Sequence, residues 1–237
     1  MSFLNARWEN LILINYIIDP NLLLPHVPKG TKLDLWNDKC YVSLVGFMFK
    51  DTRLLGIKVP FHINFEEVNL RFYVKRKENN EWKRGVVFIK ELVPKWALTF
   101  VANTIYKEHY QTVPMRHIWD KGKNKLFINY EWKYKGNWQQ IEVNASLEES
   151  EITEGSEAEF ISEHYWGYAK VSDKQTNEYQ VTHPKWKQHQ VIDYQIKVDF
   201  KEVYGEEFGF LNNVKPHSAL LAAGSEITVE KRIKLRF

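Results

Sequence analysis

Four polar residues occupy alternate positions of one predicted strand: Glu67, Asn69, Arg71 and Tyr73. Because successive side chains of a strand point to opposite faces, all four lie on one face. An arginine beside a carboxylate can hold an organic acid through charge-assisted hydrogen bonds. One interpretation is therefore a ligand-binding wall. The other is an ordinary solvated face, because antiparallel sheets commonly expose one side to water.

A second polar group follows a predicted helix near mid-chain. It consists of His109, Tyr110, Arg116 and His117. A loop at a helix end beside a curved sheet is a common place for a binding site, and a histidine there can exchange protons near neutral pH. The alternative interpretation is that these side chains only stabilise a chain reversal.

Other chemistry is poorly supported by the sequence. His183 and His189 lie six residues apart, but no nearby carboxylate or cysteine completes the three or four ligands of a zinc site. The glycine-rich nucleotide loops, Gly-x-Ser-x-Gly and His-Glu-x-x-His are absent. We therefore predict no metal and no cofactor, and we disfavour dinucleotide enzymes, phosphate-loop enzymes, common serine hydrolases and zinc proteases.

The elements that must position these residues are mostly strands. Residues 65–76 alternate polar and apolar side chains, and Asn79–Asn80 predicts a hairpin turn to a returning strand over 82–90. Over 96–105 apolar residues recur at helical spacing on nearly all sides, which predicts a buried helix. Residues 156–161 are expected to form one of several short peripheral helices. Many strands and few helices predict an α+β, mainly β fold.

The composition limits which partners and which cellular compartment are expected for the protein. The 237 residues carry 33 Lys and Arg against 30 Asp and Glu, a near balance that argues against a nucleic-acid partner. No apolar run approaches the about 20 residues of a membrane span, and no secretory signal is recognised. The single cysteine, Cys40, cannot form an internal disulfide and fits a reducing compartment. We expect a cytoplasmic protein with no membrane partner. Its oligomeric state is left open.

Several short runs, taken in order, resemble a known family. They are the Ile-Asp-Pro run over residues 18–28, the strand 41–47, the strand 65–74, and the runs 85–88, 160–168 and 183–186. Their order and spacing resemble the YqjF-like family of uncharacterised bacterial proteins, over nearly the whole chain. The resemblance implies an acetoacetate-decarboxylase-like fold, a partly open antiparallel β-barrel with one buried helix beside a cavity. No linker or repeat divides the chain, so we expect a single domain of this kind over residues 1–237.

The resemblance to the decarboxylases fails at one position. In those enzymes a lysine that follows the buried helix, in a Gly-Tyr-Pro-Lys-Lys run, forms a Schiff base. Here Tyr110 or Gln111 stands at that place, and Lys107 comes about one helical turn too early. Because an imine requires a primary amine, the decarboxylase mechanism is not expected.

Three functions remain open, in this order. The first is binding of a small apolar or carboxylated metabolite in a barrel cavity, and the second is a lysine-independent enzyme that acts on a keto or related organic acid by acid–base chemistry. The third is an interaction module without a pocket. Whether the protein is an enzyme stays undecided, and no catalytic residue is assigned. The candidate ligand-binding residues are Glu67, Asn69, Arg71, Tyr73, His109, Tyr110 and Arg116.

Overall fold

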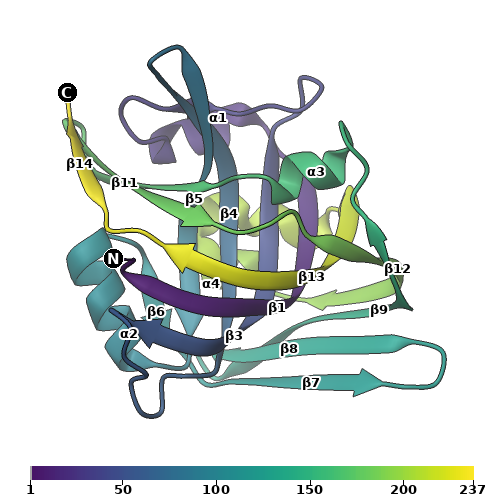
Figure 1. Ribbon diagram of the computed structural model, residues 1–237. Coiled ribbons are helices and arrows are strands. Elements are labelled where there is room, and N and C mark those ends of the chain that lie inside the picture. The colour runs from purple at the N-terminus through teal and green to yellow at the C-terminus, as the bar shows by residue number, and fades with distance from the viewer. Residues whose placement is uncertain (1) are drawn as a thin grey trace.

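The computed structural model describes residues 2–237, and antiparallel strands dominate it (Figure 1). The strands are β1 (Leu4–Ile17), β2 (Lys32–Leu33), β3 (Tyr41–Leu54), β4 (Phe65–Glu78), β5 (Glu81–Val93), β6 (Tyr110–Thr112), β7 (Met115–Lys121), β8 (Leu126–Tyr134), β9 (Asn137–Glu151), β10 (Trp166–Ser172), β11 (Gln175–Thr182), β12 (Lys187–Lys197), β13 (Ser218–Val229) and β14 (Ile233–Arg236). The α-helices are α1 (Pro20–Leu23), α2 (Trp96–Val101), α3 (Glu157–Ser162) and α4 (Phe200–Tyr204). Two 3-10 helices, η1 (Leu24–His26) and η3 (Glu206–Asn213), and one π-helix, η2 (Ala102–Tyr106), accompany them. The α+β, mainly β prediction is confirmed.

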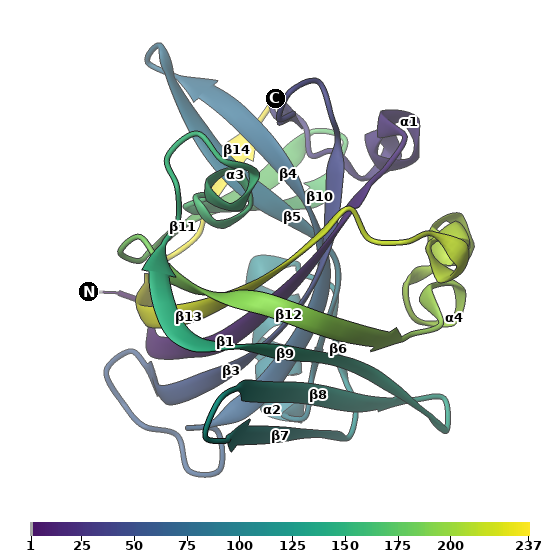
Figure 2. The same ribbon diagram turned by 90° about the vertical axis from the view of Figure 1, so that its right-hand side faces the viewer.

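The sheet curls back on itself. Its strands follow the order β14-β11-β10-β5-β4-β3-β1-β13-β12-β9-β8-β7, and β11 also pairs with β13, which joins β11, β10, β5, β4, β3, β1 and β13 into a ring. That joint consists only of Val181 opposite Val229 and Thr182 opposite Thr228. The barrel is therefore partly open, as expected. Beyond β13, the strands β12, β9, β8 and β7 continue as a wing, seen side by side in Figure 2.

Apolar side chains fill the space between the wing and the outside of the ring. The outward residues of β4, Val68, Leu70, Phe72 and Val74, are fully buried there. They belong to one apolar cluster with Trp132 of the wing and with α4. The alternate residues of β4 point into the ring, so this strand is buried on both faces. That double burial turns the polar face of β4 into an interior wall.

The mid-chain helix differs from its prediction. No residue of α2 is buried, and Trp96 and Phe100 are 72% and 65% exposed. The helix lies at the rim of the ring in Figure 1, where Leu98 and Val101 face the interior while the opposite side meets water. The expectation of one buried helix is therefore wrong. The helix is apolar on all sides although it lies at the open end of the ring and not in the core.

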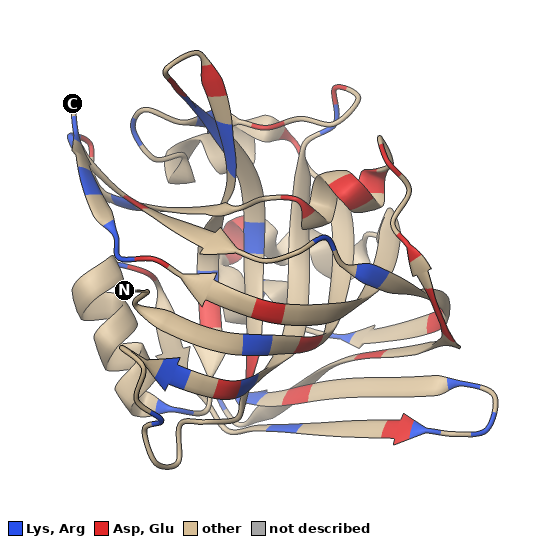
Figure 3. Cartoon of the chain, in the orientation of Figure 1, with Lys and Arg blue, Asp and Glu red and all other residues tan. Residues whose placement is uncertain are grey.

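The short peripheral helices form as expected. Ser156 caps α3, since its Oγ accepts a hydrogen bond from Glu159 N at 3.2 Å. Asp19 caps α1 by accepting from Asn21 N at 2.9 Å. Within residues 2–237, no helix combines the length and the apolar character needed to cross a membrane. Charges of both signs are interspersed over the strands, whereas α2 carries none (Figure 3).

Candidate functional site

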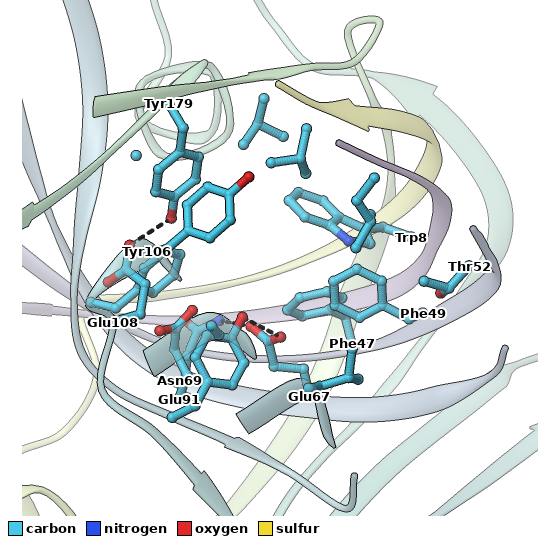
Figure 4. Close-up of a pocket in the computed structure, with 18 of the residues that line it drawn as sticks. Trp8, Phe47, Phe49, Thr52, Glu67, Asn69, Glu91, Tyr106, Glu108 and Tyr179 are labelled. Carbon is cyan, nitrogen blue, oxygen red and sulfur yellow. Dashed lines mark hydrogen bonds between the residues drawn. The ribbon is translucent and has the colours of Figure 1, made fainter. Parts of the chain in front are cut away.

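The ring contains a cavity of about 190 Å³, lined by residues of its strands and by residues of β6, α2, η2 and α3. Aromatic side chains, among them Trp8, Phe47 and Phe49, form one side of it (Figure 4). A dry cavity of roughly 150 Å³ can already hold benzene, and pockets for drug-sized ligands start near about 300 Å³. The space therefore suits a small metabolite. Because this cavity exists, the hypothesis of an interaction module without a pocket is wrong.

Four of the predicted site residues line the cavity together: Glu67, Asn69, Arg71 and Tyr110. Tyr110 OH donates to Glu67 Oε2 at 3.2 Å, and Asn69 Nδ2 donates to Glu67 Oε1 at 2.9 Å. Tyr110 reaches this place because β6 pairs in parallel with β5, next to β4. The solvated-face interpretation of β4 is wrong, since the ring buries all three of its residues named here.

Three other predicted residues do not line the cavity. Tyr73 is buried on the same strand face, but its hydroxyl is 2.6 Å from Ser43 Oγ in a packed region. His109 is exposed, because strand alternation turns it outward between Glu108 and Tyr110. Arg116 lies on β7 of the wing, exposed and ion-paired with Glu131. His117 of the same strand contacts Glu66 Oε1 at 2.6 Å.

Two carboxyl groups of the site were missed by the sequence analysis. Glu91 on β5 pairs directly across from Asn69, and Glu108 lies just before β6. A lone glutamate next to the apolar pair Leu92–Val93 was the available signal for Glu91. Glu108 could be found only from its alternation with Tyr110. The tertiary contact between β5 and β6 brings both beside Glu67.

The three carboxyl groups hold protons more tightly than usual. Burial raises the pKa of Glu67 and of Glu108 to about 7, against the hydrogen bonds that each accepts. For Glu91 burial, reinforced by the charges of Glu108 and Glu67, raises the pKa well above its ordinary value. Within residues 2–237, no lysine or arginine forms an ion pair with any of them. The group therefore carries less negative charge at neutral pH than three exposed glutamates would.

Arg71 supplies the positive charge of the cavity. Its Nη2 donates to Ile161 O at 3.3 Å, while its buried Nε has no partner. Burial lowers the pKa of His164 to about 4 and lowers that of His183, and the charge of Arg71 contributes to both shifts. Both histidines line the cavity. Arg71 thus forms no salt bridge within residues 2–237, and the nearby carboxyl group that its charge influences is Glu67, whose pKa it lowers against burial.

Near Arg71, a buried carboxylate approaches His164. Asp34 Oδ2 lies 3.4 Å from His164 Nε2, and Asp34 is itself ion-paired with Lys75 and Arg84, each at 2.7 Å. Ser162 also lines the cavity, but its Oγ donates to Ala158 O rather than to the histidine. The arrangement offers groups that can exchange protons, without a serine nucleophile in contact with its base.

Schiff-base and metal chemistry find no matching side chains in the described part of the chain. The lining contains no lysine, and Tyr110 lies beside Glu67 at the place expected for the decarboxylase lysine. No group of three or more histidine, cysteine, aspartate or glutamate side chains within residues 2–237 is arranged to hold a metal ion.

Solved structures with the same fold are acetoacetate-decarboxylase-like proteins. Acetoacetate decarboxylase from Legionella pneumophila matches with a TM-score of 0.61 and 10% identity, over 98% of this chain and 85% of that chain. An acetoacetate decarboxylase-like enzyme from Sphingomonas wittichii RW1 gives 0.63 and 9% identity, over 100% and 94%. The enduracididine biosynthesis enzyme MppR, complexed with pyruvate, gives 0.64 and 8% identity, over 99% and 89%. At these identities the likeness shows the fold alone.

Sequence comparison places the chain in a family. The uncharacterized protein YqjF of Bacillus subtilis is 29% identical over 86 residues, which cover 36% of this chain and 34% of that protein. The match thus spans about a third of the length of that relative. The model of a family described as an uncharacterized conserved protein matches residues 5–226. Since that match covers nearly the whole sequence, the chain belongs to the DUF2071 family, on an acetoacetate-decarboxylase-like fold.

Proposed function

We propose that this protein binds a small organic acid with an apolar body in the cavity of the ring. The observation that carries the proposal is Arg71, a buried guanidinium that lines an aromatic cavity and has no carboxylate partner within residues 2–237. A buried charge is costly unless it is paired and hydrogen-bonded. A ligand carboxylate would accept from the unpartnered Nε and supply that pairing.

The walls of the cavity support the same proposal. Trp8, Phe47 and Phe49 offer flat apolar surface for the body of the ligand. The neighbouring fold gives a second, weaker support, since MppR has been crystallised with pyruvate, which is a carboxylate. Fold analogy does not transfer a reaction, so the proposal is limited to binding.

The test is a comparison of a carboxylate with its neutral amide. Caproate should raise the melting temperature of the protein, whereas caproamide should not, because only the carboxylate pairs with Arg71. Arg71→Gln should weaken caproate binding by about 10- to 100-fold, the value of a lost charge-assisted hydrogen bond of roughly 1.5–3 kcal/mol. The matched control is Arg116→Gln, since Arg116 is exposed on the wing.

Two results would count against the proposal. One is equal stabilisation by caproate and caproamide, which would show that charge plays no part. The other is equal caproate affinity in the Arg71→Gln and Arg116→Gln proteins. A screen of short aliphatic and aromatic acids by thermal shift would precede these measurements and select the best carboxylate of the series.

An acid–base enzyme that acts on a keto acid is the second candidate. It is favoured by Glu67, whose pKa burial raises to about 7 and whose carboxylate accepts from Tyr110 OH. A base with a pKa near the working pH is well placed to remove a proton next to a carbonyl. Exchange of the methyl protons of pyruvate for deuterium, followed by NMR, tests this directly. Exchange that is lost in Glu67→Gln would support the enzyme, and no exchange above buffer would exclude this reaction for pyruvate.

A further inference from the structure

Three glutamates from separate elements converge on one end of the cavity. Glu67 comes from β4, Glu91 from the neighbouring β5, and Glu108 from the segment before β6 (Figure 4). The register brings them together, because Glu91 pairs with Asn69 on one side and with Tyr110 on the other. In Figure 4, Glu91 and Glu108 lie on the side of the cavity away from Trp8 and Phe49.

These carboxyl groups are buried and form no salt bridge within residues 2–237, although the charge of Arg71 acts on Glu67 and lowers its pKa against burial. Glu67, Glu91 and Glu108 are 3%, 1% and 6% exposed. Their hydrogen-bond partners are neutral: Asn69 and Tyr110 donate to Glu67, and Tyr179 donates to Glu108 at 2.8 Å. Apolar side chains of similar volume would stabilise the fold at least as well as unpaired buried carboxyl groups. A cluster of this kind therefore indicates a binding role.

Two acceptor atoms of this cluster have no donor. Glu91 Oε2 and Asn69 Oδ1 are both buried and unpartnered, and they belong to residues paired across β4 and β5. Buried polar atoms normally have partners, so each unpartnered atom requires an explanation. A group that donates several hydrogen bonds and carries positive charge would satisfy both oxygens and the neighbouring carboxylates. The ring of Tyr179, edge-on to Tyr106 at 5.1 Å, adds aromatic surface that favours a cation.

We propose that this end of the cavity binds a primary ammonium group, so that the ligand is a small amino-carboxylic acid with an apolar spacer. The inference rests on the proposed function, in which Arg71 holds the carboxylate. Arg71 follows Asn69 by two residues along β4, and two residues of a strand rise roughly 7 Å. That separation suits a ligand whose ammonium and carboxylate groups are joined by a chain of a length between those of γ-aminobutyrate and ε-aminocaproate.

No covalent step is involved in this binding. The ammonium keeps its protons, and the carboxyl group that pairs with it ionises and releases its proton to the solvent. The titratable and charged groups around the bound ammonium come from five places: Glu67 and Arg71 from β4, Glu91 from β5, Glu108 and Tyr110 from the start of β6 and the residues before it, Tyr106 from η2, and Tyr179 from β11. The tyrosines remain protonated because burial raises the pKa of each of them. Proton release by the glutamates is thus a second signature of the proposed ligand.

Isothermal calorimetry with a matched set of probes tests the inference. The probes are ε-aminocaproate, caproate, ε-hydroxycaproate and hexylamine, with γ-aminobutyrate and butyrate as the shorter pair. The amino acid should bind at least about tenfold more tightly than the acid or the hydroxy acid of equal length. At pH 6 its heat should depend on the ionisation enthalpy of the buffer with the sign of proton release, whereas caproate should release no proton.

Variants separate the two ends of the cavity. Glu91→Gln and, as a second variant, Glu108→Gln should remove the advantage of the amino group, so that the ratio of ε-aminocaproate affinity to caproate affinity falls from at least about tenfold to about one. Glu66→Gln is the matched control, since the side chain of Glu66 lies on the outer face of β4, away from the cavity, and contacts His117. Thermal unfolding of each variant reports whether it folds, and an affinity is interpreted only for a folded protein.

The same measurements distinguish a failure of the ammonium site from a failure of the carboxylate site at Arg71. If caproate binds through Arg71 but the amino group adds nothing in either chain length, the ammonium site is wrong and the proposed function stands. Equal binding of ε-hydroxycaproate and ε-aminocaproate would also overturn the ammonium site. If hexylamine binds in a Glu91-dependent way while caproate does not bind, the ammonium site stands and the carboxylate site at Arg71 is wrong.

Discussion

At the residue scale, the two faces of β4 shift the pKa values of neighbouring carboxyl groups in opposite directions. Burial raises the pKa of Glu67 to about 7 inside the ring. For Glu66, one residue earlier, burial also favours the neutral form, but the hydrogen bond with His117, a backbone hydrogen bond and the charges of His117 and Lys95 together outweigh it and hold the pKa below its usual value. Two adjacent glutamates thus differ because strand alternation sends one into the cavity and the other toward β7.

These shifts predict how stability depends on pH. The folded pKa of Glu67 lies above the 4.5 of an exposed glutamate, so the folded state binds the proton more tightly than the unfolded state. The contribution of Glu67 to the free energy of unfolding is therefore greatest below about pH 4.5 and is lost as the pH rises through about 7. Glu67→Gln should remove on the order of 2 kcal/mol of this decline between pH 5 and pH 8, measured by urea unfolding.

Glu66→Gln should change the pH dependence of the free energy of unfolding in the opposite direction. The pKa of Glu66 is lowered, so its contribution is present above the unfolded pKa and is lost as the pH falls through the folded one. This variant should lose stability near neutral pH and differ little from wild type in acid. Parallel pH profiles for the two variants would mean that the two faces of β4 do not differ in the way described.

At the scale of elements, α2 acts as a cover rather than as part of the core. Ala97, Leu98 and Val101 contribute to the lining of the cavity, while Trp96 and Phe100 face water. The π-turn η2 then carries Tyr106 into the interior, where its ring meets Tyr179 edge-on at 5.1 Å. The helix therefore forms one wall of the site without anchoring the fold.

The exposed face of α2 leads to a stability prediction. Phe100→Ala should change the free energy of unfolding by less than about 0.5 kcal/mol, as expected for an exposed side chain. Phe72→Ala is the matched comparison, because Phe72 is fully buried between the ring and the wing. It should cost about 3–5 kcal/mol in the same chemical denaturation experiment. A cost of that size for Phe100 would place the helix in the core after all.

At the scale of the whole molecule, the two ends of the sequence meet in the ring. β1 pairs antiparallel with β13 along nearly its entire length, from Leu4 opposite Val229 to Asn15 opposite Ser218. β13 also pairs with β12 and β11, so it joins the ring to the wing. The closed ring, and with it the cavity, therefore depends on the pairing of β13 with β1 and β11.

Deletions test this dependence on the last strands. A chain that ends at residue 217 lacks both β13 and β14 and should show no cooperative thermal unfolding, since β1 and β12 lose a pairing partner. A chain that ends at residue 232 lacks only β14, an edge strand paired with β11, and should still unfold cooperatively. Circular dichroism melts compare the two. Cooperative unfolding of the shorter chain would show that the ring forms without β13.

Local pattern was sufficient for much of the fold. Alternation along residues 65–76 identified β4 and its two faces, Asn79–Asn80 marked the turn to β5, and Ser156 marked the start of α3. These signals are short-range, because a strand or a cap is specified by side chains within a few residues. The same local rule placed Glu67, Asn69 and Arg71 on one face, and the structure puts that face in the cavity.

Only the tertiary structure decided what each face meets. Glu91 and Glu108 join Glu67 through the register of the β4–β5 hairpin, which shifts between Leu70 and Arg71, and through the parallel pairing of β6 with β5. The sequence pattern marked the hairpin turn but not which residues stand opposite each other. Conversely, the apolar surface of 96–105 predicts burial, although the helix lies at an open rim. The sequence by itself determined which side chains share a face. The curling of the sheet determined which face became a cavity, because burial depends on contacts between elements far apart in the chain.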